Sequence, residues 1–195
     1  MNIILIGAGG RIGSNLALHL LSKGYNLAIG DLDINPIKSK IDNLYSEKQN
    51  IFSKKIDMTS EDKYNEWLKE AFDHLGSIDG AINCSYPIGK NYGRNLEEVN
   101  LHDFNNNVSI HLGSYFNFLN LTSRFMKINK LEGSIVSISS IYGVISPRFD
   151  IYDGTKMTMP VEYAAVKSSI NHLVKYFAKF YSGIGLRFNS VCPGG

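Results

Sequence analysis

The feature that most constrains the fold of this chain is a regular alternation of short apolar runs and longer amphipathic stretches. Runs typical of buried strands cover residues 2–6, 27–31, 51–57, 78–83, 134–140 and 186–191. Stretches with helical spacing of apolar residues cover 12–23, a segment opened by Pro36, a segment after Ser60, 101–126 and 161–180. Strands that alternate with helices are joined by right-handed crossovers, which produce a parallel sheet covered on both faces. The sequence therefore predicts an α/β fold with a doubly wound parallel sheet of six strands.

Composition excludes several classes of protein. We expect residues 1–195 to form one domain, since this length suits a single core. Basic residues exceed acidic ones only by 20 to 18, which argues against nucleic acid as a partner. No apolar run reaches the roughly 18 residues of a membrane span, and the N-terminal run MNIILIGAGG lacks the basic segment of a signal peptide. Cys84 and Cys192 are isolated and the histidines show no ligand spacing, so we expect a cytoplasmic protein without a metal site.

A glycine-rich turn joins the first expected strand to the first expected helix. It reads Gly7-Ala8-Gly9-Gly10-Arg11-Ile12-Gly13. Glycines let backbone N–H groups approach a pyrophosphate, and the helix N-terminus behind them adds partial positive charge. This context favours a dinucleotide site that includes Gly7, Gly10, Arg11, Ile12 and Gly13; a tight turn without a ligand is the alternative.

Acidic residues end the next two strands. Asp31 lies 18 residues after Gly13, where a carboxylate can accept hydrogen bonds from an adenosine ribose and repel a 2′-phosphate. This position favours NAD, although Asp31 can also cap a turn and Asp33 is a second candidate. NADP stays open, because Arg11 can hold either a pyrophosphate or a 2′-phosphate. Asp57 can meet the adenine amine or cap the following helix.

A tyrosine and a lysine stand four residues apart on the last expected helix. Tyr163 and Lys167 therefore project from one helical face, where the cation stabilises a phenolate and suits the phenol to proton exchange with an alcohol or carbonyl. A surface pair is the alternative. Ser140 ends the fifth expected strand at the carboxyl edge of the sheet, where its hydroxyl can bind a reacting oxygen. Ser139 points to the opposite face and is expected to pack structurally.

Together and in order along the chain, these residues resemble the short-chain dehydrogenase/reductase family. The resemblance rests on the glycine turn, Asp57, Asn83, Ser140, Tyr163, Lys167 and Cys192-Pro193-Gly194-Gly195. It implies a Rossmann-type fold, a nicotinamide cofactor and Tyr163 as the acid and base. It also implies that Lys167 binds the nicotinamide ribose and that Ser140 orients the substrate oxygen. The same resemblance places Asn83 at the cofactor and Pro193 and Gly194 beside the nicotinamide.

Several residues depart from the family pattern. Arg11 replaces the usual middle glycine, so that the Gly7, Gly10 and Gly13 spacing resembles the extended, sugar-nucleotide-modifying branch. Asn83-Cys84-Ser85-Tyr86 replaces the usual Asn-Asn-Ala-Gly. The family's proton-relay asparagine aligns with His111, which can hold a water or shuttle a proton near pH 7. Asn107, one turn earlier, is the alternative to His111.

Ser140 and Tyr163 lie 23 residues apart, about ten more than is common in the family. The additional residues, 147–160, are expected to form a loop over the active site, and their mixed charged and aromatic composition suits a polar, sugar-like substrate. With His111-Leu-Gly-Ser, this loop resembles a subgroup of flagellin-modification or nonulosonic-acid sugar-pathway dehydrogenases. The cations expected near a phosphate or carboxylate, if they are not merely solvated, are Lys90, Arg94, Arg148 and Lys156.

Family members continue for about another helix or two and a seventh strand, so the sequence is expected to lack a C-terminal strand and lid. The two long helices pair across a two-fold axis in the family, which predicts a homodimer or homotetramer. The predicted function is an NAD(P)-dependent oxidoreductase that interconverts a hydroxyl and a carbonyl on a small, sugar-like metabolite. A non-catalytic NAD(P)-binding subunit and a sugar-nucleotide epimerase or dehydratase are the alternatives.

Overall fold

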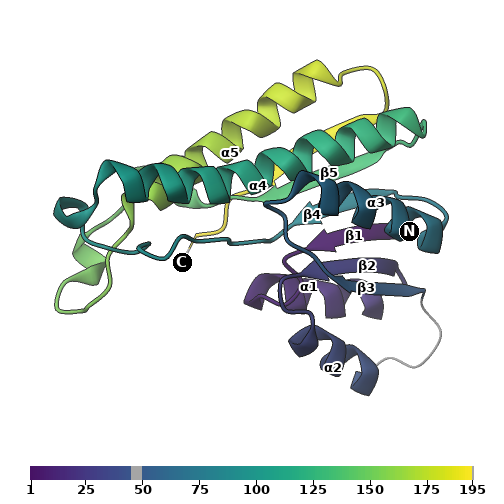
Figure 1. Ribbon diagram of the computed structural model, residues 1–195, viewed down its shortest axis with the longest axis horizontal. Helices are drawn as coiled ribbons and strands as arrows, with labels where there is room; N and C mark the ends of the chain where they lie inside the picture. The colour runs from purple at the N-terminus through teal and green to yellow at the C-terminus, as the bar shows by residue number, and fades with distance from the viewer. Residues whose placement is uncertain (45–49, 195) are drawn as a thin grey trace.

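The computed structural model describes residues 1–44 and 50–194, and Figure 1 shows a parallel sheet between two layers of helices. The strands are β1 (Asn2–Ile6), β2 (Asn26–Asp31), β3 (Ile51–Lys55), β4 (Gly80–Asn83), β5 (Gly133–Ile138) and β6 (Leu186–Val191). Their spatial order is β3-β2-β1-β4-β5-β6, and all neighbouring strands are parallel. This is the order of a Rossmann-type dinucleotide-binding sheet, so the predicted fold class is confirmed.

Within the described residues, five α-helices connect the strands. They are α1 (Arg11–Ser22), α2 (Asn35–Leu44), α3 (Glu61–Leu75), α4 (Leu101–Ile128) and α5 (Val161–Phe180). Short 3₁₀ helices lie at Leu96–Glu98, Ile141–Gly143 and Asp150–Tyr152, the last of them inside the expected 147–160 loop. In the part of the chain that the structure describes, no helix is long and apolar enough to cross a membrane.

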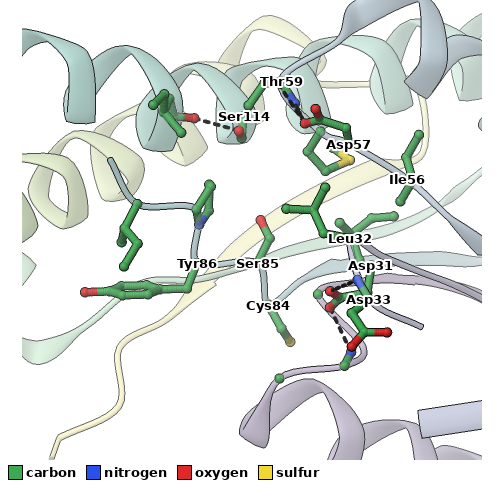
Figure 2. A pocket seen from close by; sticks show the side chains of 18 of the residues that line it. Asp31, Leu32, Asp33, Ile56, Asp57, Thr59, Cys84, Ser85, Tyr86 and Ser114 are labelled. Atoms are coloured by element: carbon green, nitrogen blue, oxygen red, sulfur yellow. Dashed lines mark hydrogen bonds between the residues drawn. The ribbon is translucent and has the colours of Figure 1, made fainter. Parts of the chain in front are cut away.

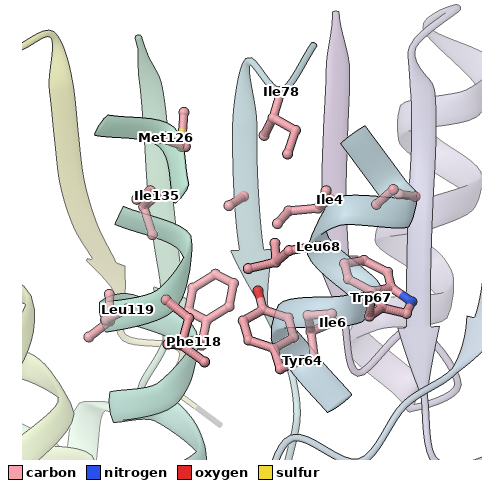
Figure 3. Close-up of a cluster of buried hydrophobic side chains, with 14 of the residues drawn as sticks. Ile4, Ile6, Tyr64, Trp67, Leu68, Ile78, Phe118, Leu119, Met126 and Ile135 are labelled. Atoms are coloured by element: carbon pink, nitrogen blue, oxygen red, sulfur yellow. The ribbon is translucent and has the colours of Figure 1, made fainter. Parts of the chain in front are cut away.

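The pleat of the sheet divides the core into two layers. Ile3 and Leu5 of β1 face α1 and α2, whereas Ile4 and Ile6 face α3, α4 and α5. Figure 3 shows the second layer, in which the fully buried Trp67 packs among aliphatic side chains. Because adjacent strand residues serve opposite layers, the register of β1 is fixed by burial on both faces.

Two strand ends differ from the prediction, and both differences place polar side chains in turns. β3 ends at Lys55 rather than at residue 57, because the Asp57 carboxylate accepts hydrogen bonds from the N–H and the hydroxyl of Thr59 and turns the chain toward α3. β5 ends at Ile138, so Ser140 is not the last strand residue. Its hydroxyl oxygen instead accepts a hydrogen bond from the Tyr142 N–H and begins the 3₁₀ helix at Ile141–Gly143.

Candidate active site

The glycine turn packs tightly between β1, β4 and α1. Gly7 has a φ of +79°, and a Cβ there would lie 2.4 Å from the backbone nitrogen of Ser85. A Cβ on Gly13 would lie 2.0 Å from the carbonyl oxygen of Gly7. Arg11 and Ile12 open α1 with exposed side chains, and N–H groups in the first turn of a helix have no acceptor within it. The turn therefore suits an anionic group held by backbone N–H donors.

The acids predicted to meet the adenosine already have partners within the chain. Asp31 accepts hydrogen bonds from the N–H of Gly9, at 2.8 Å, and from the N–H of Asp33, at 3.1 Å. The carboxylate therefore fixes the glycine turn to the end of β2. Hydrogen bonds from Thr59 hold the pKa of Asp57 below its usual range, so this carboxylate is ionised at neutral pH.

These elements surround a cavity of about 650 Å³, shown in Figure 2. Four of the predicted cofactor residues line it, namely Gly7, Gly10, Asp31 and Asp57. Gly13 stands behind this lining, against Gly7. Asn83 is fully buried at the end of β4, and its side-chain oxygen accepts hydrogen bonds from the N–H and the hydroxyl of Ser85. The cavity extends from the acids toward Tyr86, which lies at its other end.

Tyr163 and Lys167 lie together on the inner side of α5. Lys167 is 3% exposed, and its Nζ lies 5.6 Å from the centre of the Tyr163 ring. The ammonium donates a hydrogen bond of 3.0 Å to the carbonyl oxygen of Ile138, at the end of β5. Burial lowers the pKa of Lys167 to about 8, so the side chain is mainly charged at pH 7. A surface pair is thus excluded for Lys167.

Ser140 and the last described residues pack beside this pair. The hydroxyl of Ser139 donates a hydrogen bond to the Lys167 carbonyl oxygen, which is the structural role expected for it. One residue further on, Ser140 is 4% exposed. Pro193 accepts a hydrogen bond from the N–H of Ile141, and Gly194 lies against the Ile141 side chain. The segment after β6 therefore adjoins Ser140, while Gly195 lies outside the described residues.

His111 and Asn107, the alternatives for the relay position, are both buried on α4. The Asn107 side-chain oxygen accepts a hydrogen bond from the Gly89 N–H, and its amide nitrogen has no partner among the described residues. Both ring nitrogens of His111 also lack a partner among residues 1–44 and 50–194. Burial lowers the pKa of His111 to about 3, and the Lys167 charge adds to this effect. The ring is therefore neutral near pH 7, where one ring nitrogen donates a hydrogen bond and the other accepts one.

Sequence reasoning assigned no role to Tyr86, whose ring lies close to three of the proposed catalytic groups. Its ring centre lies 5.8 Å from that of Tyr163 and 5.0 Å from that of His111, and Lys167 Nζ lies 5.5 Å from it. The sequence feature that could have pointed to Tyr86 is its position three residues after β4, where the family pattern has a glycine.

Two of the four cations considered for anion binding have acidic partners. Arg94 pairs with Asp103 at 3.2 Å, and Arg148 pairs with Asp150 at 2.5 Å. These pairs favour solvated, locally balanced charges over an anion site at Arg94 and Arg148.

The fold and the site together define the class of protein. It is an α/β protein with a dinucleotide-type glycine turn and a half-buried tyrosine beside a buried lysine on α5. A family model described as short chain dehydrogenase matches residues 1–195, and the chain belongs to this family. The family resemblance stated from the sequence is therefore confirmed. Its members are oxidoreductases that act on CH–OH groups of small molecules with NAD(P), and they often form oligomers.

Relatives support the same assignment. The chain is 32% identical to post-translational flagellin modification protein A of Campylobacter coli, over 99% of this chain and 76% of that protein. It is 26% identical to a 3-oxoacyl-[acyl-carrier-protein] reductase of Thermotoga maritima, over 98% of this chain and 72% of the relative. A solved short chain dehydrogenase from Leptospira borgpetersenii with bound NAD+ superimposes with a TM-score of 0.82 at 27% identity, covering 100% of this chain and 70% of that one.

Proposed function

We propose that this short-chain dehydrogenase uses NAD to interconvert a hydroxyl and a carbonyl on a polar, sugar-like metabolite. The observation that carries the proposal is that Tyr163 and Lys167 lie on α5 with Tyr86 against both, and that Tyr86 also lines the cavity formed by the glycine turn. Proton exchange and cofactor binding are thereby assigned to one connected site.

The residues of the cavity fit a dinucleotide. The N–H groups that open α1 suit the pyrophosphate, with Gly7, Gly10 and Gly13 permitting close approach and Arg11 and Ile12 forming the first helical turn. Asp31 suits a ribose with free hydroxyls and disfavours a 2′-phosphate, which supports NAD over NADP. The relative from Leptospira borgpetersenii was solved with NAD+ bound, which supports the same choice. Asp57 is assigned to the adenine, and Asn83, Pro193 and Gly194 to the nicotinamide side.

The proton chemistry is assigned to side chains of this chain. Tyr163 gives a proton to the substrate oxygen in reduction and takes it back in oxidation. Lys167 holds positive charge beside the phenol and the ribose, and Ser140 orients the reacting oxygen. His111, neutral and without a side-chain partner among the described residues, is assigned the relay position ahead of Asn107. The bound nicotinamide supplies hydride transfer.

Two observations support a sugar-like substrate. The 147–160 loop is polar and aromatic, and the 32% identical relative is named for flagellin modification. A homodimer or homotetramer is proposed as well, because α4 and α5 expose Phe116, Tyr176 and Phe180, which are 44%, 61% and 66% exposed. Sedimentation at micromolar concentration tests the oligomer.

The deciding experiment replaces one phenol. Tyr163→Phe is expected to lower turnover by roughly 10²–10⁴-fold while NADH binding, followed by fluorescence, stays within about twofold. Tyr25→Phe, a half-buried phenol that packs in the layer of α1 and α2, is the matched control and should keep wild-type turnover. Retention of most of the rate in Tyr163→Phe would show that the acid and base assignment is wrong.

A further inference from the structure

The ammonium of Lys167 is buried without an acidic partner. The residue is 3% exposed, and within residues 1–44 and 50–194 its only hydrogen bond goes to the carbonyl oxygen of Ile138. No ion pair in the same part of the chain includes Lys167. A charge that is taken out of water costs stability unless other groups compensate for the lost hydration. Something other than a carboxylate must therefore stabilise this ammonium.

Three tyrosine rings surround the ammonium. Its Nζ lies 5.2 Å from the ring centre of Tyr115, 5.5 Å from that of Tyr86 and 5.6 Å from that of Tyr163. These rings come from α4, from the loop after β4 and from α5, so three separate segments contribute to one cage. The negative face of an aromatic ring attracts a cation within about 6 Å, and more strongly where water is excluded. The rings therefore take the place of the missing acidic partner.

Tyr115 is the ring of this cage that the fold holds most firmly. It is 0% exposed, packs against α5, and its hydroxyl donates to the carbonyl oxygens of Ile138, at 2.9 Å, and Ser85, at 3.1 Å. The Ile138 carbonyl is the one that also accepts the hydrogen bond from Lys167. Tyr86, by contrast, is 46% exposed, so water weakens its attraction for the ammonium. Tyr115 thus joins α4 to the ends of β4 and β5 with its ring beside Lys167.

We propose that Tyr115 is a positioning residue that acts through Lys167. Its ring keeps the buried ammonium charged, and its hydroxyl holds the carbonyl group of Ile138 that orients the ammonium. The consequence for the reaction rests on the proposed function, in which the charge of Lys167 stabilises the phenolate of Tyr163. The cage itself is tested without turnover, by measuring the charge of Lys167.

The test is a titration of one lysine. The intact chain is labelled with ¹³C at the ε carbon of its lysines, and the NMR signal that is absent from Lys167→Arg is followed against pH. Wild type should show a midpoint at about pH 8. Tyr115→Leu removes the ring and should lower this midpoint by about 0.5–1.5 pH units, because the charged form loses its cation–π attraction. Tyr115→Phe keeps the ring and should stay within about 0.3 pH units of wild type.

The neighbouring titratable groups leave this midpoint readable. Burial raises the pKa of Cys84 and that of Tyr86 to about 12, and it also raises that of Tyr115. Burial lowers the pKa of His111 to about 3. None of these four groups changes its charge near pH 8. Three further titratable groups on or beside α5 are the same in every variant, namely Glu162, Tyr163 and Cys192.

Tyr86→Leu covers the case in which Tyr115→Leu does not fold, since the Tyr86 ring is half exposed in a loop. It should lower the midpoint by about 0.3–0.7 pH units. Phe118→Leu removes another fully buried ring from α4, and as the matched control it should keep the wild-type midpoint.

The proposal is overturned if the midpoint stays or rises in Tyr115→Leu, or if Tyr115→Phe lowers it as far as Tyr115→Leu does. Where Tyr115→Leu does not fold, an unchanged midpoint in Tyr86→Leu overturns it. Failure of the oxidoreductase assignment looks different, since it shows as absent NADH binding or as full turnover in Tyr163→Phe.

Discussion

The two ends of the site differ in the hydrogen-bond partners of their polar side chains. At the cofactor end, Asp31 binds the N–H groups of Gly9 and Asp33, and Asp57 binds Thr59. The chain itself therefore fixes the conformation of this end.

At the other end, between α4 and α5, buried atoms of Asn107, His111 and Glu162 have no hydrogen-bond partner among the described residues. Buried polar atoms are rarely left without partners, and each one costs stability when it is. The difference teaches that hydrogen bonds within the chain hold the two carboxylates at the cofactor end, whereas the buried groups between α4 and α5 keep unused hydrogen-bonding capacity at the expense of stability. Substitutions at the cofactor end should therefore act mainly on the stability of the fold. Substitutions between α4 and α5 should act mainly on ligand binding and on the pH dependence of stability.

The largest structural effect is expected at Gly13. In Gly13→Ala the new Cβ meets the backbone oxygen of Gly7 at 2.0 Å, and backbone cannot give way as a flexible side chain can. The unfolding free energy in urea should fall by about 3 kcal/mol, with loss of NADH binding.

Gly113→Ala is the matched control for Gly13→Ala. Gly113 also lies in a helix, but a Cβ there has no heavy atom within 4 Å. This variant should gain about 0.5–1 kcal/mol, because alanine loses less backbone entropy than glycine. Equal stability of the two variants would remove the argument that the cofactor end is fixed by close backbone contact.

The next largest effect is expected in the pH dependence of stability, which reports on the buried His111 at the substrate end. Unfolded His111 gains a proton below about pH 6.5, whereas the folded residue resists protonation down to about pH 3. Stability should thus decline as the pH falls through this window. Between pH 7 and 5, wild type should lose about 2 kcal/mol more than His111→Gln, which has no group to titrate. Parallel pH curves in urea would mean that the imidazole is hydrated or paired.

The same contrast explains how much of the fold and of the site could be predicted from the sequence alone. The sheet and its helices follow from apolar runs and helical spacing, and the glycine turn follows from its place between a strand and a helix. These signals are local. Tyr163 and Lys167 were found because one helix sets their spacing.

Tyr86 and Glu162 were not assigned a role, because their meaning depends on contacts between distant segments. No local pattern states that the loop after β4 lies over α5, or that Glu162 is buried. The end of β5 was also misplaced. Ser139 and Ser140 follow the apolar run directly, and the sequence does not show that their hydrogen bonds with Lys167 and Tyr142 turn the chain.

A smaller effect is expected at Asp31, where structure and ligand binding combine. Asp31→Ala removes the acceptor for Gly9 and the proposed partner of the ribose. The loss of one such hydrogen bond is worth about 1 kcal/mol, so NADH should bind roughly fivefold more weakly. The binding of NADPH should weaken less than that of NADH, because Asp31→Ala also removes the repulsion between the carboxylate and the 2′-phosphate. If the ratio of the NADH and NADPH affinities is unchanged, Asp31 caps the turn and does not select between the cofactors.

The smallest effect is expected at Arg148, in the 147–160 loop that the sequence predicts to lie over the active site. Its guanidinium pairs with Asp150, but the two side chains are 68% and 60% exposed, and such pairs contribute little. Arg148→Ala should leave the urea midpoint unchanged within error. It should also keep the wild-type turnover, because Asp150 balances the loop cation locally. A selective loss of the binding of an anionic substrate in Arg148→Ala would instead place an anion site in the loop.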